Sequence, residues 1–341
     1  MLDKLNLKSK LIIAHININH VINKFDPLVS IIRDKIHILL ISETKLDDSF
    51  PNSQFYIEGY KLPFRKDRNR FGGGLLFYVK NENICKGVKT ELPMSVECMF
   101  IEVILNKVKY IIVGGYNPHK ENISYFLNQI SNQLDKMLVS YDNILLLGDL
   151  NALESDNSMI AFKEMYNLKN LIKVPTCFKN PLNPTSIDVM LTNKKENFMH
   201  SLALETGLSD HHKMTLAVLK STFVKQKPIK LNYRSYTKFD ENMFKDDLLS
   251  SLNSVNCESC LTYDIFRNVY MKVLNKHAPE KQKTLRGNHQ PFMNKKLSKA
   301  FMHRSKLKNI YNKFPSDANL LNYKKQRNFC TNLLRREKNF L

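Results

Sequence analysis

The stretch that decides the fold is Ile144-Leu-Leu-Leu-Gly-Asp-Leu-Asn151. Its apolar start is typical of a buried strand, and Gly148, Asp149 and Asn151 follow where that strand ends. A carboxylate there could orient or deprotonate a water, and an amide could donate to a phosphate oxygen. An Asp turn that stabilises the strand end would explain the same residues without any chemistry. The stretch therefore predicts a strand and leaves its function open.

Outward from this stretch, residues 1–222 alternate short apolar runs with stretches of helical period. Asn106-Lys107 separates two such runs and predicts a tight hairpin turn. The alternation predicts one α/β domain with a mixed sheet or sheets. We expect strands at Leu11–Ile16, Ile36–Ile41, Leu75–Val79, Met99–Leu105, Val108–Val113, Asn143–Leu147, Ile187–Leu191 and Met214–Leu219, and helices at Val21–Asp34, Asn122–Leu138 and Ser158–Tyr166.

The charge of the chain is uneven. Its 341 residues carry 52 Lys+Arg against 32 Asp+Glu, a formal net charge of +20. Residues 223–341 hold 25 basic and 9 acidic residues, whereas residues 1–222 hold 27 and 23. Such a basic segment favours a polyanionic partner, either nucleic acid or an acidic membrane surface. The acidic residues that metal chemistry needs are concentrated in the first part.

Composition also excludes several classes of protein. No apolar run approaches the ~20 residues needed to cross a bilayer. Met1–Lys10 carries three lysines and no apolar core of signal-peptide length. The six cysteines are scattered and form no disulfide framework. We therefore expect a protein of a reducing compartment that is neither secreted nor transmembrane.

Residues 223–341 are predicted to form a mostly helical, basic extension. Cys257 and Cys260 have the spacing of a zinc site, but no second pair accompanies them, and a structural zinc needs four ligands. We expect helices at Glu241–Leu252, Thr262–Asn275, Asn294–Asn312 and Ala318–Asn339.

Further polar groups stand at the ends of predicted strands: Asn17, Glu43, Tyr116 and the run Ser209-Asp-His-His212. A sheet edge aims such side chains while the loops leave access to them. Glu43 could ligate a hard cation such as Mg²⁺, although an N-cap or an ion pair with Lys45 would also explain it. A histidine beside a carboxylate could be a general base near neutral pH, or part of a polar turn. Together these groups supply what metal-assisted phosphodiester hydrolysis requires: a carboxylate-held cation, a base and neutral donors.

The order of these pieces resembles the endonuclease/exonuclease/phosphatase superfamily. Within it, Ser-Glu-Thr, Gly-Tyr-Asn-Pro, Gly-Asp-Leu-Asn and Ser-Asp-His resemble the apurinic-type endonuclease domain of non-LTR (LINE-type) retrotransposons. The resemblance covers residues 8–222 and implies a four-layer α/β sandwich, two packed mixed β-sheets flanked by helices. Residues 223–341 resemble the connector toward a reverse transcriptase. No aromatic-x-Asp-Asp signature occurs, so we expect a truncated copy or a fragment.

The resemblance implies a role for each matched residue. Asp149, or His211 held by Asp188, would prepare the water. The implied metal ligands are Glu43, Asn17 and Asp210; the implied catalytic residues are His211, Asp149, Asn151, Asp188 and Tyr116; and the expected DNA contacts are Thr176, by resemblance, and Arg68, from its basic loop.

We therefore expect a Mg²⁺-dependent DNA endonuclease, with Mn²⁺ as an alternative ion, that leaves a 3′-hydroxyl and a 5′-phosphate. Its genomic substrate favours the nucleus over the cytoplasm, and the basic extension could hold element RNA. One alternative is a catalytically silent remnant that only binds nucleic acid, with binding that falls steeply with salt. Another is a phosphodiesterase or phosphatase of the same fold that acts on a phosphoinositide or sphingolipid.

Overall fold

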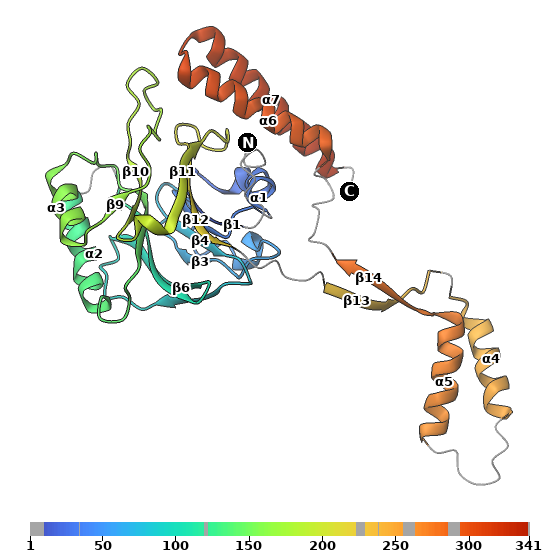
Figure 1. The fold of residues 1–341 in the computed structure, drawn as a ribbon. Helices are drawn as coiled ribbons and strands as arrows, with labels where there is room; N and C mark the ends of the chain where they lie inside the picture. The colour runs from blue at the N-terminus through green and yellow to red at the C-terminus, as the bar shows by residue number, and fades with distance from the viewer. Residues whose placement is uncertain are drawn as a thin grey trace. The chain divides into compact units, whose positions relative to one another are not determined.

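The apolar runs of the first part of the chain form two six-stranded sheets in the computed structural model (Figure 1). The structure describes residues 10–33, 35–118, 122–222, 229–237, 239–254, 263–285 and 294–339. The first sheet contains β1 (Lys10–Asn17), β2 (Ile38–Ser42), β3 (Phe64–Lys66), β4 (Leu75–Val79), β11 (Phe198–Leu204) and β12 (Met214–Thr222). The second contains β5 (Ile84–Val88), β6 (Glu97–Leu105), β7 (Val108–Tyr116), β8 (Ile144–Asp149), β9 (Lys169–Asn170) and β10 (Asp188–Thr192).

Both sheets are mixed. Their strand orders are β11-β12-β1-β2-β4-β3 and β5-β6-β7-β8-β10-β9. The pairs β1–β2 and β7–β8 are parallel, and the other pairs are antiparallel. In each sheet the two parallel strands end at the same edge. The polar motifs follow the strands at this edge.

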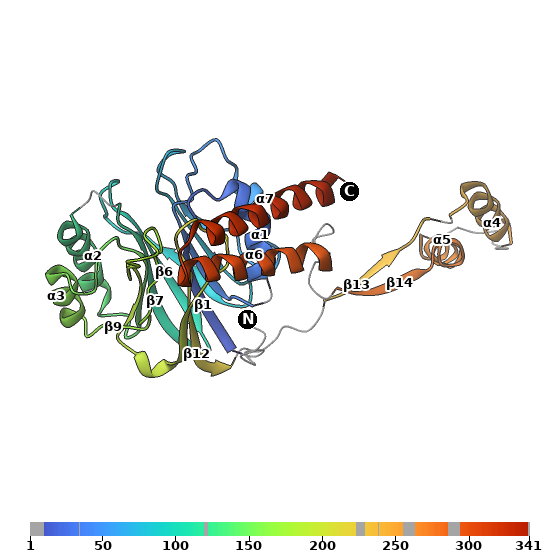
Figure 2. The same cartoon turned by 90° about the horizontal axis from the view of Figure 1, so that it is seen from above.

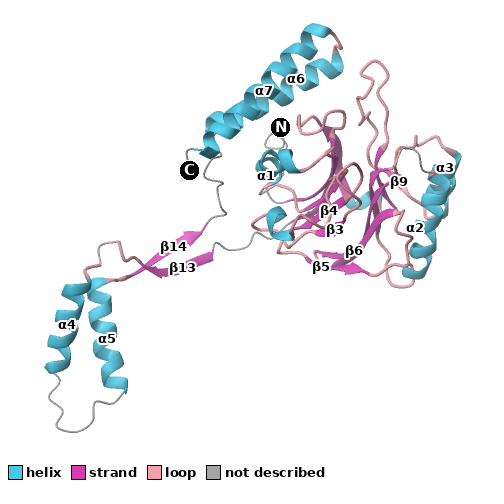
Figure 3. Cartoon of the chain, turned by 180° about the vertical axis from the view of Figure 1, so that it is seen from behind, coloured by secondary structure: helices cyan, strands magenta, loops and turns pink. Residues whose placement is uncertain are grey.

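Helices cover the outer faces, so the expected four layers are confirmed. Helix α1 (Phe25–Ile32) packs on the first sheet, and α2 (Ile123–Met137) and α3 (Asn157–Met165) pack on the second (Figures 2 and 3). Leu40 and Leu147 are among the buried side chains that fill the space between the sheets. Each such burial contributes about 1.5–3 kcal/mol, which makes the sheet interface a rigid support for the strand ends.

All the strands expected from apolar runs are present, but β3, β5, β9 and β11 were not expected. Strand β5 is mostly exposed and β9 has two residues, so neither produces an apolar run. The hairpin at Asn106-Lys107 is confirmed, and φ values of 48° and 68° at these residues fit a turn with two left-handed positions.

Gly148 is required by the geometry of the decisive stretch. Its φ is +152°, and a Cβ atom there would lie 1.8 Å from the carbonyl oxygen of Gly115 on β7. Backbone atoms cannot give way as a flexible side chain can, so only glycine fits between β8 and β7. This close approach fixes the backbone immediately before Asp149.

The chain forms two compact units, Met1–Lys225 with His289–Leu341, and Gln226–Asn288. This division differs from the single extension expected for residues 223–341. The second unit pairs β13 (Ile229–Arg234) with β14 (Glu280–Leu285), which were not expected, and contains the expected helices as α4 (Glu241–Asn253) and α5 (Tyr263–His277). Cys257 and Cys260 lie outside the described residues.

The last two expected helices, α6 (Lys295–Lys313) and α7 (Asp317–Asn339), form a hairpin in the first unit. Lys308 Nζ on α6 donates to the backbone oxygen of Asp210 at 2.7 Å. Asn312 Nδ2 donates to Glu205 Oε2 at 2.7 Å. These contacts tie α6 to the segment that follows β11. Within the described residues, no helix is long and apolar enough to cross a membrane.

Candidate active site

Asn17, at the end of β1, joins the carboxylates of two different sheets. Its Nδ2 donates to Glu43 Oε1 at 3.0 Å and to Asp149 Oδ2 at 2.8 Å. Tyr116, at the end of β7, donates from its hydroxyl to the same Glu43 oxygen at 2.9 Å. Parallel pairing aligns Tyr116 with Asp149 across β7 and β8. Four residues from separate parts of the sequence therefore meet at one edge of the sandwich.

These side chains line a cavity of about 750 Å³. Asn151 also lines it, with a left-handed φ of 48° and its Nδ2 bonded to the backbone oxygen of Asn117 at 2.8 Å. Its backbone N–H donates to Asp149 Oδ1 at 3.0 Å. Asparagine tolerates this conformation well, so the Gly-Asp-Leu-Asn turn holds both the carboxylate and the amide in place.

The histidine bonded to Asp188 is His212, which corrects the expectation of His211. His212 Nδ1 donates to Asp188 Oδ2 at 3.0 Å and lies 3.9 Å from Asp149 Oδ2. His212 pairs with Cys177 in a β-bridge, so its chain is extended there. Both rings line the cavity, but only the second of them reaches Asp188.

Burial and neighbouring charges set the protonation states of the side chains that meet in the cavity. Burial, followed by the charge of Asp188, raises the pKa of Asp149 to about 7. Burial opposes ionisation of both Asp188 and His212, but their mutual attraction outweighs it. The pKa of Asp188 is therefore lowered and that of His212 raised, so the two form a charged pair at neutral pH. Burial, then Glu43, also raises the pKa of Tyr116, which stays a hydrogen-bond donor.

Two other expected site residues have different surroundings. Thr176 is fully buried, so it cannot contact DNA as expected; its Oγ1 instead accepts from the backbone N–H of Asp188 at 3.2 Å. Asp210 Oδ2 accepts from Asn19 Nδ2 at 3.2 Å and lies 3.7 Å from Lys24 Nζ. The Asp210 carboxylate is therefore already engaged, and the structure does not bring it to Glu43.

Arg68, which we expect to contact DNA, forms an ion pair with Glu97, and its side chain stays 37% exposed. Its Nη1 lies 2.7 Å from Oε1 of the buried Glu97, and its Nε donates to the backbone oxygen of Gly72 at 2.9 Å. The guanidinium also lies 6.0 Å from the ring centroid of Tyr116. Arg68 therefore joins the buried Glu97 to the ring of Tyr116.

We predict that Arg68→Ala lowers the free energy of unfolding by about 1–3 kcal/mol, because it leaves Glu97 buried without its cation. Urea denaturation measures this. Arg68→Ala combined with Glu97→Gln should regain part of the loss. Arg70→Ala, which breaks the exposed pair with Asp47, is the matched control and should change stability much less, because solvent screens exposed ion pairs. Unchanged stability with weakened DNA binding would instead support the DNA contact that the sequence predicts for Arg68.

The donor set of the cavity fits a divalent cation. Asp149, Asp188 and His212 offer ligand atoms that lie within 4.8 Å of one another. His212 and Asp188 are bonded to each other. The carboxylate oxygens of Glu43 and Asp149 are therefore the ligand atoms whose negative charge a bound cation would neutralise. Among the described residues, no Lys or Arg forms an ion pair with Glu43. Mg²⁺ and Mn²⁺ prefer oxygen ligands such as these carboxylates.

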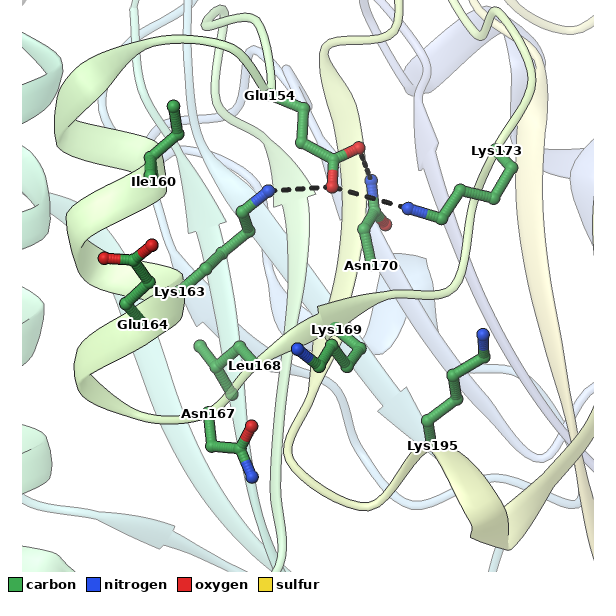
Figure 4. Close-up of a pocket in the computed structure, with 10 residues that line it drawn as sticks. All are labelled: Glu154, Ile160, Lys163, Glu164, Asn167, Leu168, Lys169, Asn170, Lys173 and Lys195. Atoms are coloured by element: carbon green, nitrogen blue, oxygen red, sulfur yellow. Dashed lines mark hydrogen bonds and ion pairs between the residues drawn. The ribbon is translucent and has the colours of Figure 1, made fainter.

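A second cavity, of about 450 Å³, lies beside α3 and β9 (Figure 4). Glu154 in it accepts from Lys163 Nζ at 2.8 Å and from Asn170 Nδ2 at 3.2 Å, and lies 3.5 Å from Lys173 Nζ. Its one central carboxylate is therefore neutralised by lysines. Among the described residues that line this cavity there is no histidine, and Glu164 is the other carboxylate. The cavity that Glu43 and Asp149 line is therefore the candidate active site.

Comparisons with known proteins place the fold. No family model and no curated protein matches the sequence. An AP endonuclease from Leishmania major is similar in structure, with a TM-score of 0.54 and 12% identity over 65% of this chain and 91% of that one. This chain therefore shares the fold of that AP endonuclease. NExo from Neisseria, a 3′ phosphatase solved with a product DNA hairpin, gives a TM-score of 0.52 and 14% identity over 62% and 100%. The endonuclease domain of TRAS1, a telomere-specific non-LTR retrotransposon, gives 0.49 and 15% over 62% and 98%.

Sequence reasoning missed His15, Asn19 and His212. His15 sits in an apolar strand two residues before Asn17, where the pattern favours a core position. Asn19 lies two residues after Asn17, but its bond to Asp210 could not be inferred from spacing. His212 was adjacent to the histidine that the resemblance selected.

Proposed function

We propose that the protein is a metal-dependent DNA endonuclease that hydrolyses a phosphodiester bond to a 3′-hydroxyl and a 5′-phosphate. The observation that carries the proposal is the single amide of Asn17 that bridges Glu43 and Asp149, with His212 and Asp188 beside them. An acidic cluster with a charged His–Asp pair is suited to a phosphate and its attacking water. The superfamily fold and the DNA-acting names of two similar structures support this choice.

The residues of the chain divide the chemistry among them. Asp149 orients the water and accepts its proton as the water oxygen bonds to phosphorus and the P–O3′ bond breaks. His212, kept protonated by Asp188, donates to a non-bridging oxygen, and Asn151 and Tyr116 limit where that oxygen can lie. Glu43, Asp149 and Asn17 would hold a Mg²⁺ or Mn²⁺ ion, which offsets charge on the phosphate when bound. The departing 3′ oxygen takes its proton from solvent.

DNA as substrate is favoured by the motifs and by the charge of the chain. The hairpin of α6 and α7 belongs to the same compact unit as the cavity, and its many Lys and Arg residues suit a phosphate backbone. The resemblance to retrotransposon endonucleases makes target-site nicking the proposed role, in which the new 3′ end would prime reverse transcription. A nuclear location and a contact with element RNA belong to the same proposal.

A plasmid assay tests the proposal. With Mg²⁺ the protein should convert supercoiled plasmid to the open circle, and EDTA should abolish the conversion. DNA ligase should reseal the nick, because it requires a 3′-hydroxyl and a 5′-phosphate. A gel shift that survives in EDTA, without nicking in Mg²⁺, would indicate a silent binding module. Phosphate release from inositol phosphates without nicking would instead indicate the lipid-type substrate.

A further inference from the structure

His15 presents an unpaired nitrogen to an unpaired oxygen of Asp188. The His15 ring is fully buried in β1, and its Nε2 lies 3.0 Å from Ser42 Oγ on β2. Among the residues that the structure describes, its Nδ1 has no hydrogen-bond partner, and neither has Asp188 Oδ1. These two atoms lie 3.6 Å apart, and both side chains are 0% exposed. Two buried polar atoms without partners therefore face each other across the sheet interface.

A hydrogen bond between them would satisfy both atoms. A buried polar group left without a partner costs about 1–3 kcal/mol, and a shift of a few tenths of an ångström closes the gap. A neutral imidazole carries one N–H and one acceptor nitrogen. If Nδ1 carries the proton, Nε2 accepts from the Ser42 hydroxyl, and Nδ1–H donates to Asp188. This tautomer leaves no atom of the ring unpaired.

The position of His15 on β1 relates it to Asn17. Residues two apart on a strand face the same side, so His15 and Asn17 both point toward the second sheet. There Asp188 pairs with Asp149 across β10 and β8. Asn17 donates to Asp149, and His15 lies 3.6 Å from Asp188. One strand of the first sheet therefore contacts both carboxylates of the second sheet.

We propose that His15 is a positioning residue, whose Nδ1–H donates to Asp188 Oδ1 and leaves Asp188 Oδ2 to hold His212. The line from Ser42 through His15 and Asp188 to His212 fixes the direction of the His212 ring toward the cavity. His15 touches no substrate and acts only through Asp188. The inference rests on the proposed function for its kinetic effect, but its tautomer does not depend on that function.

The test compares two substitutions at one site. His15→Asn keeps a donor at the position of Nδ1, whereas His15→Leu removes it at similar volume. His15→Leu should lower kcat for plasmid nicking about tenfold to a hundredfold, as for the loss of a group that orients an active-site ligand, with KM little changed. His15→Asn should recover most of that loss. His37→Leu, at another buried histidine whose Nδ1 accepts from Ile12 N at 3.2 Å, is the control and should leave kcat unchanged.

A spectroscopic measurement keeps the inference independent of activity and of the folding of His15→Leu. In the wild-type protein, ¹⁵N shifts of the His15 ring should show a protonated Nδ1 and an unprotonated Nε2. An unprotonated Nδ1 would overturn the inference even if nicking is observed. Equal losses in His15→Asn and His15→Leu, or full kcat in His15→Leu, would overturn it as well. If the wild type does not nick DNA but shows the expected tautomer, the proposed function fails and the hydrogen bond stands.

Discussion

Replacing His212 with alanine should lower the rate of Mg²⁺-dependent nicking by about 10²–10⁴-fold, the range expected for loss of a proton-transfer or charge-stabilising group. His212 is the histidine bonded to Asp188, at 3.0 Å, and it lies next to Asp149. Alanine removes the ring that connects the Asp188 charge to the cavity. The effect should fall on kcat, because the ring would act on the reacting phosphate.

The neighbouring histidine provides a matched control. His211→Ala removes the same side chain from the same segment and should leave the rate within the same order of magnitude. The His211 ring lines the cavity but has no hydrogen bond to Asp149 or Asp188 among the described residues. Single-turnover rates of both variants on one plasmid substrate give the comparison. A large loss in His211→Ala with little loss in His212→Ala would reverse the assignment and favour the histidine chosen from the sequence.

The two histidines show where sequence reasoning stops. The pattern Ser-Asp-His-His places a histidine beside the site, but spacing cannot tell which of two adjacent residues faces Asp188. That choice depends on the bridge between Cys177 and His212, which is a long-range contact.

Contacts with residues far along the chain explain other features of the site. Thr176 is fully buried, and its hydroxyl oxygen accepts from the backbone N–H of Asp188, which lies 12 residues further along the chain. Arg68 comes from a loop rich in charge, where the partner Glu97 lies 29 residues away. By contrast, Asn17, Glu43 and Tyr116 were located correctly at strand ends, because short apolar runs predicted those strands well. Strands β13 and β14 are polar ribbons and give no such run.

Asp149→Asn should abolish nicking to a similar degree, about 10²–10⁴-fold, because an amide cannot accept the proton of the water. The same substitution should also change how stability depends on pH in EDTA. Burial, with the charge of Asp188, raises the pKa of Asp149 in the folded protein to about 7, against about 3.9 for an unfolded aspartate. Between these values the folded protein binds the proton more tightly than the unfolded chain does. The free energy of unfolding of the wild type should therefore fall as pH rises through this window and stay low above it.

An asparagine side chain cannot ionise, so the free energy of unfolding of Asp149→Asn should not show this fall with rising pH. The difference in unfolding temperature, Asp149→Asn minus wild type, should grow from about pH 4 toward about pH 7 to 8 in EDTA, and saturating Mg²⁺ should reduce it by stabilising the wild type. The slope of this difference is the measurement, because the Asp149→Asn substitution also changes the bonds with Asn17 and Asn151 by a pH-independent amount. Asp210→Asn, at a more exposed carboxylate of the neighbouring segment, is the control and should show no such growth. A difference that stays constant across this pH range would mean that Asp149 is already ionised in the metal-free protein, and Asp149 would then need no cation to keep its charge.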